Sequence, residues 1–371
     1  MAAKKASDDY DANVTKVMVM DDATPRETHV LTKGAYDKPQ GETLAAGVPA
    51  ILNALPAGEK NNRLGLAKWL FAADNPLTAR VTVNRYWQQF FGVGIVKTVD
   101  DFGAQGERPV NPELLDYLAV TLRESNWNLK QLVRLYVTSA TYRQSSKLTP
   151  EILEKDPENR LLARGPRYRL PSITLRDQAL AASGLLVEKI GGPPVKPYQP
   201  PGIWEEATFG FIKYEQDHGD ALYRRSLYTF WRRIVGPTEF FDTASRTTCT
   251  VRPQRTNTPL HALTTLNDVT FVEAARSLAQ RVMLAEKSNQ ARLDLAYRLV
   301  LSRRPTGKER EVLLTALDRL TLDYEADKDA AKKLLSEGES KRDASLKISD
   351  HAAWTSLCLE ILNLDEAMTK E

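Results

Sequence analysis

An arginine-rich segment between Ala221 and Leu260 carries the side chains best suited to binding an anion. It holds seven arginines against two carboxylates, and it contains no lysine. A guanidinium group presents a planar fork that binds carboxylate, sulfate or phosphate through two hydrogen bonds, and it stacks on aromatic rings. Because tyrosine and tryptophan are interleaved with these arginines, the segment is predicted to line a groove for an anionic or polyhydroxylated ligand. Its ligand-binding candidates are Tyr223, Arg224, Arg225, Tyr228, Trp231, Arg246, Arg252 and Asn257, and its other arginines are Arg232, Arg233 and Arg255.

A purely structural role for the same arginines stays open. They would then pair with carboxylates from other segments and hold irregular loops in place. The candidate partners are Asp100, Asp101, Asp177 and Asp217. Nucleic acid is not expected as a partner, since the formal net charge of the chain is only +3 and a nucleic-acid surface needs a basic balance across the domain.

A second group of polar and aromatic residues lies between Asn75 and Gly106. Such groups must find partners if they are buried, so they bind either a ligand or one another. The ligand-binding candidates here are Arg80, Asn84, Arg85, Trp87 and Gln105. Asp101, with Asp242 of the arginine-rich segment, is predicted to supply a carboxylate for proton transfer, and in a glycosidase the separation of two carboxyl groups would decide the stereochemistry. The alternative for Asp101 is a turn in which its side chain caps backbone amides.

Several other chemistries have little support in the sequence. Cys249 and Cys358 are the only cysteines, and there is no CxxCH motif, so no cofactor is expected on this chain. Cys249 is expected to be buried and inert, and whether the two cysteines pair is left open. The four histidines form no HxH or HExxH pair, so no metal site is predicted. Gly191 to Pro194 lacks the context of a phosphate loop and is interpreted as a helix stop.

Composition indicates a globular chain. Of its 371 residues, 42% are hydrophobic and 27% are charged, which is enough to bury a full core. No run approaches the 18 apolar residues of a transmembrane helix, and the polar start at 1–13 lacks the apolar stretch of an export signal. The sequence therefore predicts neither a transmembrane segment nor an export signal in this chain.

The residue pattern predicts a mainly α, irregular helical domain with a small β arm and a long loop segment rich in aromatics and arginine. Residues 1–58 are expected to form an extended or β arm, with short strands at Val17–Met20 and Thr28–Leu31. Residues 59–371 are expected to form the main helical domain. Within it, 191–258 is predicted to be a loop-rich inner segment and 323–347 an exposed charged segment, and alternation at Arg225–Trp231 indicates a β conformation.

Three helices carry their own start signals. Asn75-Pro76, Asn111-Pro112 and Thr258-Pro259 each place proline in the first turn after a residue that can cap the helix. Thr306 and Glu309 have the spacing of a capping box. Another helix is expected to follow Pro171 and to end near Gly191.

Ordered motifs run along nearly the whole chain. They include Pro25-Arg26-Glu27-Thr28-His29, Asn75-Pro76-Leu77-Thr78-Ala79-Arg80, Asn84-Arg85, Asp101-Phe102-Gly103, Pro112-Glu113-Leu114-Leu115-Asp116, Tyr223-Arg224-Arg225-Ser226-Leu227-Tyr228, Thr256-Asn257-Thr258-Pro259-Leu260 and Leu364-Asp365-Glu366. In these motifs the chain resembles one known family, the C-terminal domain of unknown function 1553 of planctomycete-type cytochrome c domain-containing proteins.

The resemblance implies a bacterial module found in the periplasm or at the cell surface, together with an upstream c-type haem domain. Haem is expected only on that upstream domain, and the chain is expected to be the terminal domain alone. Where the family pattern commonly has glutamine after Thr-Pro-Leu, this chain has His261, so a catalytic role is not expected for His261. Two functions follow as hypotheses. One is binding, and possibly hydrolysis, of a polar or anionic polymer such as an acidic or sulfated glycan; the alternative is a non-catalytic structural or docking domain for a c-type cytochrome partner.

Overall fold

Helices dominate the computed structural model, which describes residues 2–14, 17–24, 26–232, 234–252 and 254–370. This part of the chain contains fifteen α-helices and two small antiparallel sheets of two strands each. The mainly α fold expected from the sequence is therefore confirmed.

Local hydrogen bonds explain where the main helices begin. The side-chain oxygen of Asn75 accepts hydrogen bonds from the backbone amides of Leu77 and Thr78 at 3.0 and 3.1 Å, just ahead of α3 (Thr78–Phe91). These amides have no partner inside the helix, so the cap satisfies them.

The predicted prolines at two other helix starts are confirmed, but neither Asn111 nor Thr258 caps its helix through a side-chain hydrogen bond. Proline occupies the first turn of α4 (Pro112–Glu124) and of α9 (Pro259–Asn267). A capping box formed by Thr306 and Glu309 opens α12 (Gly307–Ala326), as predicted.

The chain packs as two units, each of which has its own contacts. Unit 1 comprises Met1–Asn84 and Asn111–Leu132, and unit 2 comprises Arg85–Val110 and Val133–Glu371. Unit 1 contains α1 (Ala2–Asn13), β1 (His29–Leu31), β2 (Pro39–Thr43), α2 (Arg63–Leu70), the first part of α3, and α4. Unit 2 contains the rest of α3, most of α5 (Leu129–Thr138), α6 (Pro150–Lys155), β3 (Tyr168–Arg169), α7 (Ser172–Ser183) and all later elements.

The N-terminal arm differs from its prediction in two places. Residues 2–13 form the helix α1 instead of an extended segment, because alanine and lysine favour a helix and no alternating apolar pattern opposes it. Val17–Met20 forms no strand, and these side chains are exposed with no strand beside them among the described residues. Strand β1 does form near the second predicted position, where it pairs with β2 in antiparallel register, Leu31 opposite Pro39.

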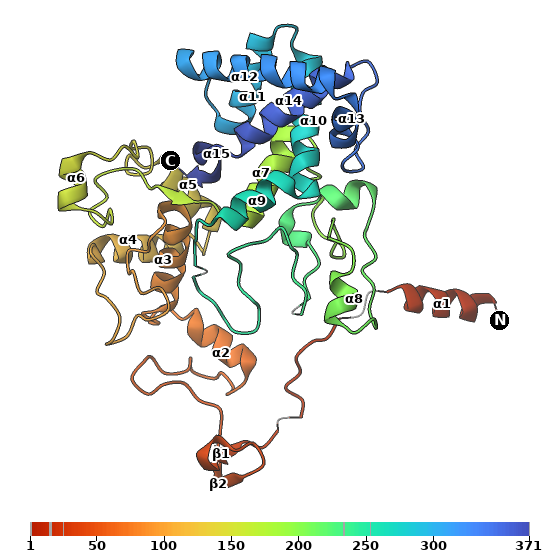
Figure 1. Cartoon of the computed structure of the whole chain (residues 1–371). Coiled ribbons are helices and arrows are strands. Elements are labelled where there is room, and N and C mark those ends of the chain that lie inside the picture. The colour runs from red at the N-terminus through yellow and green to blue at the C-terminus, as the bar shows by residue number, and fades with distance from the viewer. Residues whose placement is uncertain (1, 15–16, 25, 233, 253, 371) are drawn as a thin grey trace. The chain divides into compact units, whose positions relative to one another are not determined.

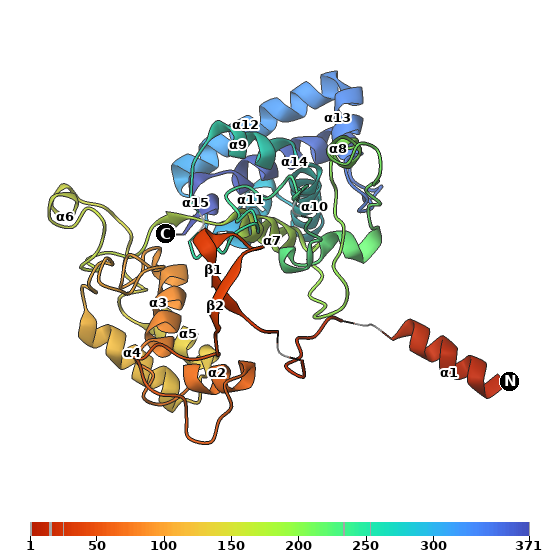
Figure 2. The same cartoon turned by 90° about the horizontal axis from the view of Figure 1, so that it is seen from below.

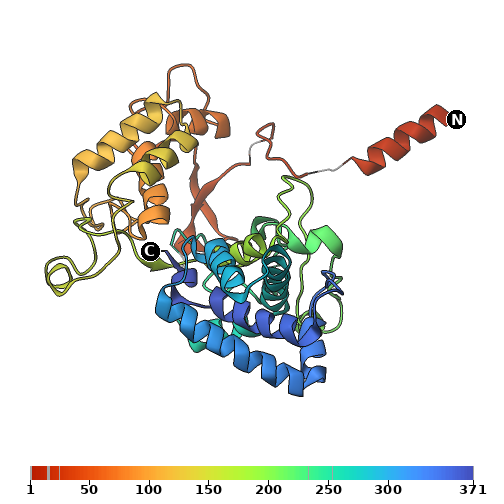
Figure 3. The same ribbon diagram turned by 90° about the horizontal axis from the view of Figure 1, so that it is seen from above.

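Unit 2 is built around α10 (Val269–Ala285). It packs against α7, α11 (Asn289–Leu301) and α14 (Ile348–Leu362), which surround it in Figures 1 and 2. Fully buried side chains such as Leu278, Val282, Leu293, Leu357 and Ile361 form the core between these helices. On the other side of α14 lies α12 (Figure 3).

Most residues of the charged segment 323–347 are exposed, and one helical face within it is buried. It contains the end of α12 and α13 (Lys328–Leu335), which packs on α14. Ala331 and Leu335 of α13 are buried against Ala352, because a spacing of four residues puts both on one helix face. The sequence pattern obscured this face because charged residues surround it.

The inner segment contains few regular elements. It includes α8 (Ile203–Ala207) and two short 3-10 helices, η2 (Gly219–Tyr223) and η3 (Ser226–Tyr228). The predicted strand at Arg225–Trp231 was wrong, because that stretch contains η3 and only an isolated bridge from Val195 to Thr229. The helix that follows Pro171 is α7, and it ends at Ser183, where Gly184 adopts the left-handed conformation, instead of near Gly191.

Two consecutive residues of α7 hold this irregular segment. Arg176 is fully buried; its Nε lies 2.9 Å from Glu239 Oε1, and its Nη groups donate to the carbonyl oxygens of Leu222 at 2.7 Å and Arg224 at 2.9 Å. The carboxylate of Asp177 accepts hydrogen bonds from the amide and hydroxyl of Ser226, both at 2.7 Å. Hydrogen bonds from side chains of α7 thus stabilise a segment that lacks the backbone hydrogen bonds of a β-sheet.

Replacing Arg176 with methionine is expected to destabilise unit 2. The change leaves Glu239 buried without its cation and removes donors from two buried carbonyls, so the free energy of unfolding should fall by about 3–5 kcal/mol. Urea denaturation followed by circular dichroism measures this. Arg298→Met on the exposed face of α11 is the matched control, with an expected change within about 0.5 kcal/mol; equal stability of the two variants would contradict the assigned role of Arg176.

Candidate functional site

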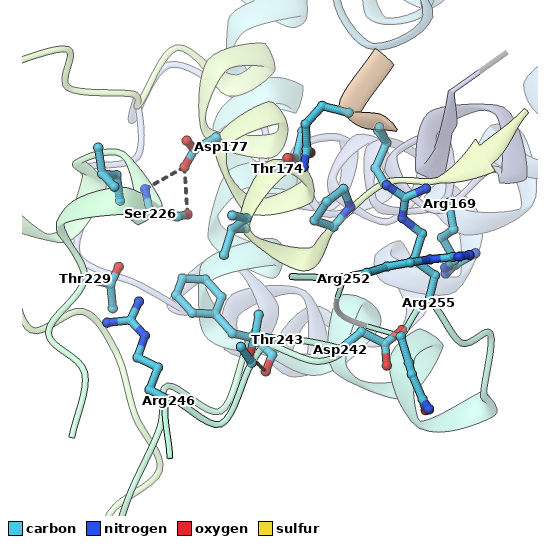
Figure 4. Close-up of a pocket in the computed structure, with 18 of the residues that line it drawn as sticks. Arg169, Thr174, Asp177, Ser226, Thr229, Asp242, Thr243, Arg246, Arg252 and Arg255 are labelled. Atoms are coloured by element: carbon cyan, nitrogen blue, oxygen red, sulfur yellow. Dashed lines mark hydrogen bonds between the residues drawn. The ribbon is translucent and has the colours of Figure 1, made fainter. Parts of the chain in front are cut away.

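The arginine-rich segment lines an open pocket of about 440 Å³ in unit 2. Its walls come from the C-terminal part of α3, from β3 and α7, and from the inner segment between Ser226 and Arg255. Figure 4 shows that its arginines lie on two sides: Arg246 beside Thr229, and Arg169, Arg252 and Arg255 together on the opposite side. The pocket therefore offers two separate positions for negative charge.

Among the three grouped arginines, Arg255 is held by packing on an aromatic ring instead of by a carboxylate. The guanidinium of Arg255 lies 4.3 Å from the ring centre of Tyr168. Tyr168 is itself fixed, because its hydroxyl donates to the carbonyl of Gln89 and its ring lies where a Cβ at Gly92 would come within 2.8 Å. A larger residue at Gly92 would displace this ring and the arginine stacked on it.

Like charges lie close together in this group. Burial lowers the pKa of Arg255, and the nearby charge of Arg252 lowers it further. The Nε of Arg169 is buried without a hydrogen-bond partner. Within the described ranges, no carboxylate forms an ion pair with Arg169, Arg246, Arg252 or Arg255, so their charge is uncompensated.

Arg246, on the other side, is stacked on an aromatic ring. Its guanidinium lies 4.5 Å from the ring centre of Trp231. Phe240 stacks on the same tryptophan at 6.1 Å, and a Cβ at Gly236 would come within 3.1 Å of it. Trp231 is therefore half-buried between these groups, and its ring positions Arg246 at the pocket.

Two carboxylates reach the pocket, and neutral donors engage both. Asp177 binds Ser226, as described above. Asp242 accepts a hydrogen bond from the Thr256 hydroxyl at 2.9 Å, and its Oδ1 lies 3.8 Å from His261 Nε2. His261 is buried and stacks on Phe241 with the ring centres 4.0 Å apart. Asp242 is thus fixed at the rim by the loop that carries Arg252 and Arg255.

The structure brings together only some of the candidate site residues from the arginine-rich segment. Trp231, Asp242, Arg246 and Arg252 line the pocket, and Asn257 lines a neighbouring one. Arg233 lies outside the described residues.

The remaining candidates of the segment serve the fold. Arg224 is buried, donates to the carbonyls of Lys189, Gly191 and Pro193, and stacks on Tyr228 at 3.8 Å. Tyr223 donates to Glu273 at 2.9 Å, and exposed Arg225 pairs with Glu188 at 3.3 Å. These residues do not line the pocket, because their side chains instead contact α10 and the loop at 188–193.

The earlier motif does not contribute its candidates to this pocket either. In unit 1, Arg80 binds Asp116 at 2.6 Å and Asn84 is fully buried. In unit 2, Trp87 is buried and stacks on Phe91 at 3.9 Å, while Arg85 and Gln105 are exposed and do not line the pocket.

The catalytic candidate Asp101 does not line this pocket either. It accepts a hydrogen bond from the amide of Gly103 at 2.7 Å, which is the turn arrangement considered as its alternative.

Sequence reasoning missed part of the lining. Gln88, Gln89, Arg169, Asp177 and Phe240 all line the pocket and were not candidates. Arg169 reaches the pocket because β3 pairs with β4 (Thr369–Lys370) at the far end of the chain. A strand of only two residues has no recognisable pattern in the local sequence. For Gln88 and Gln89, the only sequence signal of a place in the site was that they follow the candidate residue Asn84 by about one helical turn.

The chain belongs to a family whose function is not known. The family model described as "Protein of unknown function (DUF1553)" matches residues 62–317, well over half of the chain, in agreement with the resemblance seen in the motifs. Comparison with curated proteins finds no match. Comparison with solved structures finds none either.

Two further findings bear on the class of site. Across the described ranges, no group of three or more His, Cys, Asp or Glu side chains is placed to hold a metal ion. None of the helices in this part of the chain is both long and apolar enough to cross a membrane.

The buried glutamate next to the pocket predicts a pH dependence of stability. Burial raises the pKa of Glu239 from 4.5 to about 7, and Arg176 opposes this rise. Because the folded state then holds a proton that the unfolded state releases, stability falls as pH rises from about 4.5 to 7, by about 3 kcal/mol from this group.

Comparison with Glu239→Gln isolates the effect. Burial lowers the pKa of His351 to about 4, which gives the opposite slope between pH 4 and 6.5 in both proteins. The difference in unfolding free energy between the two proteins, measured by urea titration at several pH values, should therefore change steadily between pH 4.5 and 7. A difference that is constant over this window would contradict the raised pKa.

The two cysteines should differ in reactivity. Cys249 is exposed, contrary to the prediction that it is buried, because its loop carries few apolar residues to cover it. Cys358 is fully buried in α14, and burial raises its pKa. A thiol reagent should modify one cysteine in the native protein and two after denaturation; Cys249→Ser should abolish the native reaction.

Proposed function

We propose that unit 2 binds an acidic or sulfated glycan in the arginine-lined pocket. One observation carries the proposal: four guanidinium groups surround a pocket in which, among the described residues, no carboxylate pairs with them. An anion would relieve the repulsion between Arg252 and Arg255 and would supply the acceptors that these groups lack. A glycan of this kind is met at the cell surface or in the periplasm, and we infer that location for the protein.

The size and lining of the pocket support a sugar-sized ligand. Its volume of about 440 Å³ lies within the range of small-molecule sites. Gln88, Gln89, Thr174, Thr243 and Gln254 add side chains that can donate and accept hydrogen bonds with hydroxyl groups. Leu170, Pro171 and Phe240 provide apolar surface between the two groups of arginines.

Hydrolysis is a secondary part of the proposal. A glycosidase needs two carboxyl groups on opposite sides of the scissile bond. Asp242 and Asp177 are the two that line the pocket, whereas Asp101 belongs to its own turn. If the bound glycan is cleaved, Asp242→Asn should abolish the release of reducing ends while binding persists.

Neutralising one pocket arginine should weaken glycan binding. Arg252→Gln and Arg246→Gln each remove a charge-assisted contact, so the dissociation constant for a sulfated oligosaccharide should rise about tenfold by calorimetry. Arg298→Gln, which changes an exposed arginine outside the pocket, should bind like the original chain.

Thermal-shift screening provides the wider test. Sulfated and uronic oligosaccharides should raise the melting temperature, whereas neutral ones of the same length should raise it less. If none of these sugars shifts the melting temperature, the glycan proposal fails and the alternative, a non-catalytic domain that docks to a c-type cytochrome, is favoured.

A further inference from the structure

A second pocket adjoins the first and shares its grouped arginines. It has a volume of about 450 Å³ and lies wholly within unit 2. Arg169, Arg252 and Arg255 line both pockets, so they form a ridge between them. The two hollows are therefore neighbours along one continuous surface.

The carboxylates of the second pocket are already neutralised. Glu158 pairs with Lys97 at 2.8 Å, and Asp365 pairs with Arg167. Hydrogen bonding holds Arg164 in place as well, since it donates to the carbonyls of Asp156 and Pro157 at 2.9 and 2.8 Å. Both described carboxylates that line this pocket are thus paired with other cations, and among the described residues none forms an ion pair with the ridge arginines.

Two of the three ridge arginines, Arg169 and Arg255, are positioned by their neighbours. Arg255 is stacked on Tyr168, which packs on Gly92 and bonds to the carbonyl of Gln89, and Arg169 lies on the short strand β3. A preorganised cationic group lowers the entropy cost of binding. Beyond it, Asn257 lines only the second pocket and is exposed, with no hydrogen bond to any described residue.

We infer that the two pockets are adjacent subsites for one linear anionic oligosaccharide of at least two sugar units. The inference rests on the proposed function and deepens it. A sulfate or carboxylate group would lie on the ridge, with one sugar in the first pocket near Arg246 and the next sugar in the second pocket near Asn257. A ligand that occupies both subsites gains affinity, because the second contact is intramolecular once the first has formed.

Chain-length dependence tests the inference. Calorimetric titration would compare a sulfated monosaccharide with chains of two and four of the same unit, and a uronic series of the same lengths would distinguish sulfate from carboxylate. The two-unit chain should bind about tenfold or more tightly than the single unit. Arg252→Gln should weaken binding of every length.

Asn257→Ala is the decisive variant, since it changes no charge and so leaves non-specific attraction of a longer anion unaltered. It should weaken the two-unit and four-unit chains severalfold and leave the single unit unchanged, whereas Arg246→Gln should weaken all of them. Arg298→Gln is the matched control for the arginine variants, and circular dichroism checks that each variant folds.

The possible failures are distinct. If all lengths bind equally, or if Asn257→Ala has no effect on the longer chains, the two-subsite inference is overturned while binding in the first pocket stands. If no sugar of either series binds at any length, the proposed function itself fails, and the inference fails with it.

Discussion

The contact between Arg176 and Glu239 is the interaction on which the pocket depends. Both side chains are buried, one on α7 and the other next to Phe240 and Asp242 of the pocket wall. The same guanidinium binds two carbonyls of the inner segment, so a single charge holds two stretches of that segment, 222–224 and Glu239, against α7. Because burying unpaired charge is costly, the loops have little freedom to leave this arrangement. A segment with almost no regular structure can therefore keep a defined shape.

The arginines of the inner segment divide into two classes, and the division follows their partners. Buried Arg224 donates to three carbonyls and therefore has a structural role. Arg246 and Arg255 lie at the pocket, where aromatic rings position them without neutralising them, and exposed Arg252 lies near Arg255. Stacking on a ring is well suited to this, because it fixes a guanidinium while leaving its N–H groups available to a ligand. The structural explanation of the arginine-rich composition thus applies to Arg224, whereas the arginines at the pocket have no carboxylate partner among the described residues.

Sequence patterns anticipated the features that arise locally. The caps at Asn75 and Thr306 and the prolines that open α4 and α9 were all correct, because each is decided by a few neighbouring residues. Errors occurred where a local signal competed with tertiary contacts. Alternation at Arg225–Trp231 suggested a strand, yet Arg176 and Asp177 bind that stretch as a short helix and loop. Likewise, α13 buries a face that its charged neighbours concealed.

The amino-acid sequence by itself determined the family, the mainly α class, the helix starts and the concentration of arginine in one segment. Only the tertiary structure decided which arginines remain unpaired, since that depends on carbonyls and carboxylates far away in the chain. It also decided the pocket: Arg169 reaches it through the pairing of β3 with β4, about 200 residues later. Composition determines which side chains the segment contains. Long-range contacts determine which of its arginines form hydrogen bonds within the fold and which remain available to a ligand.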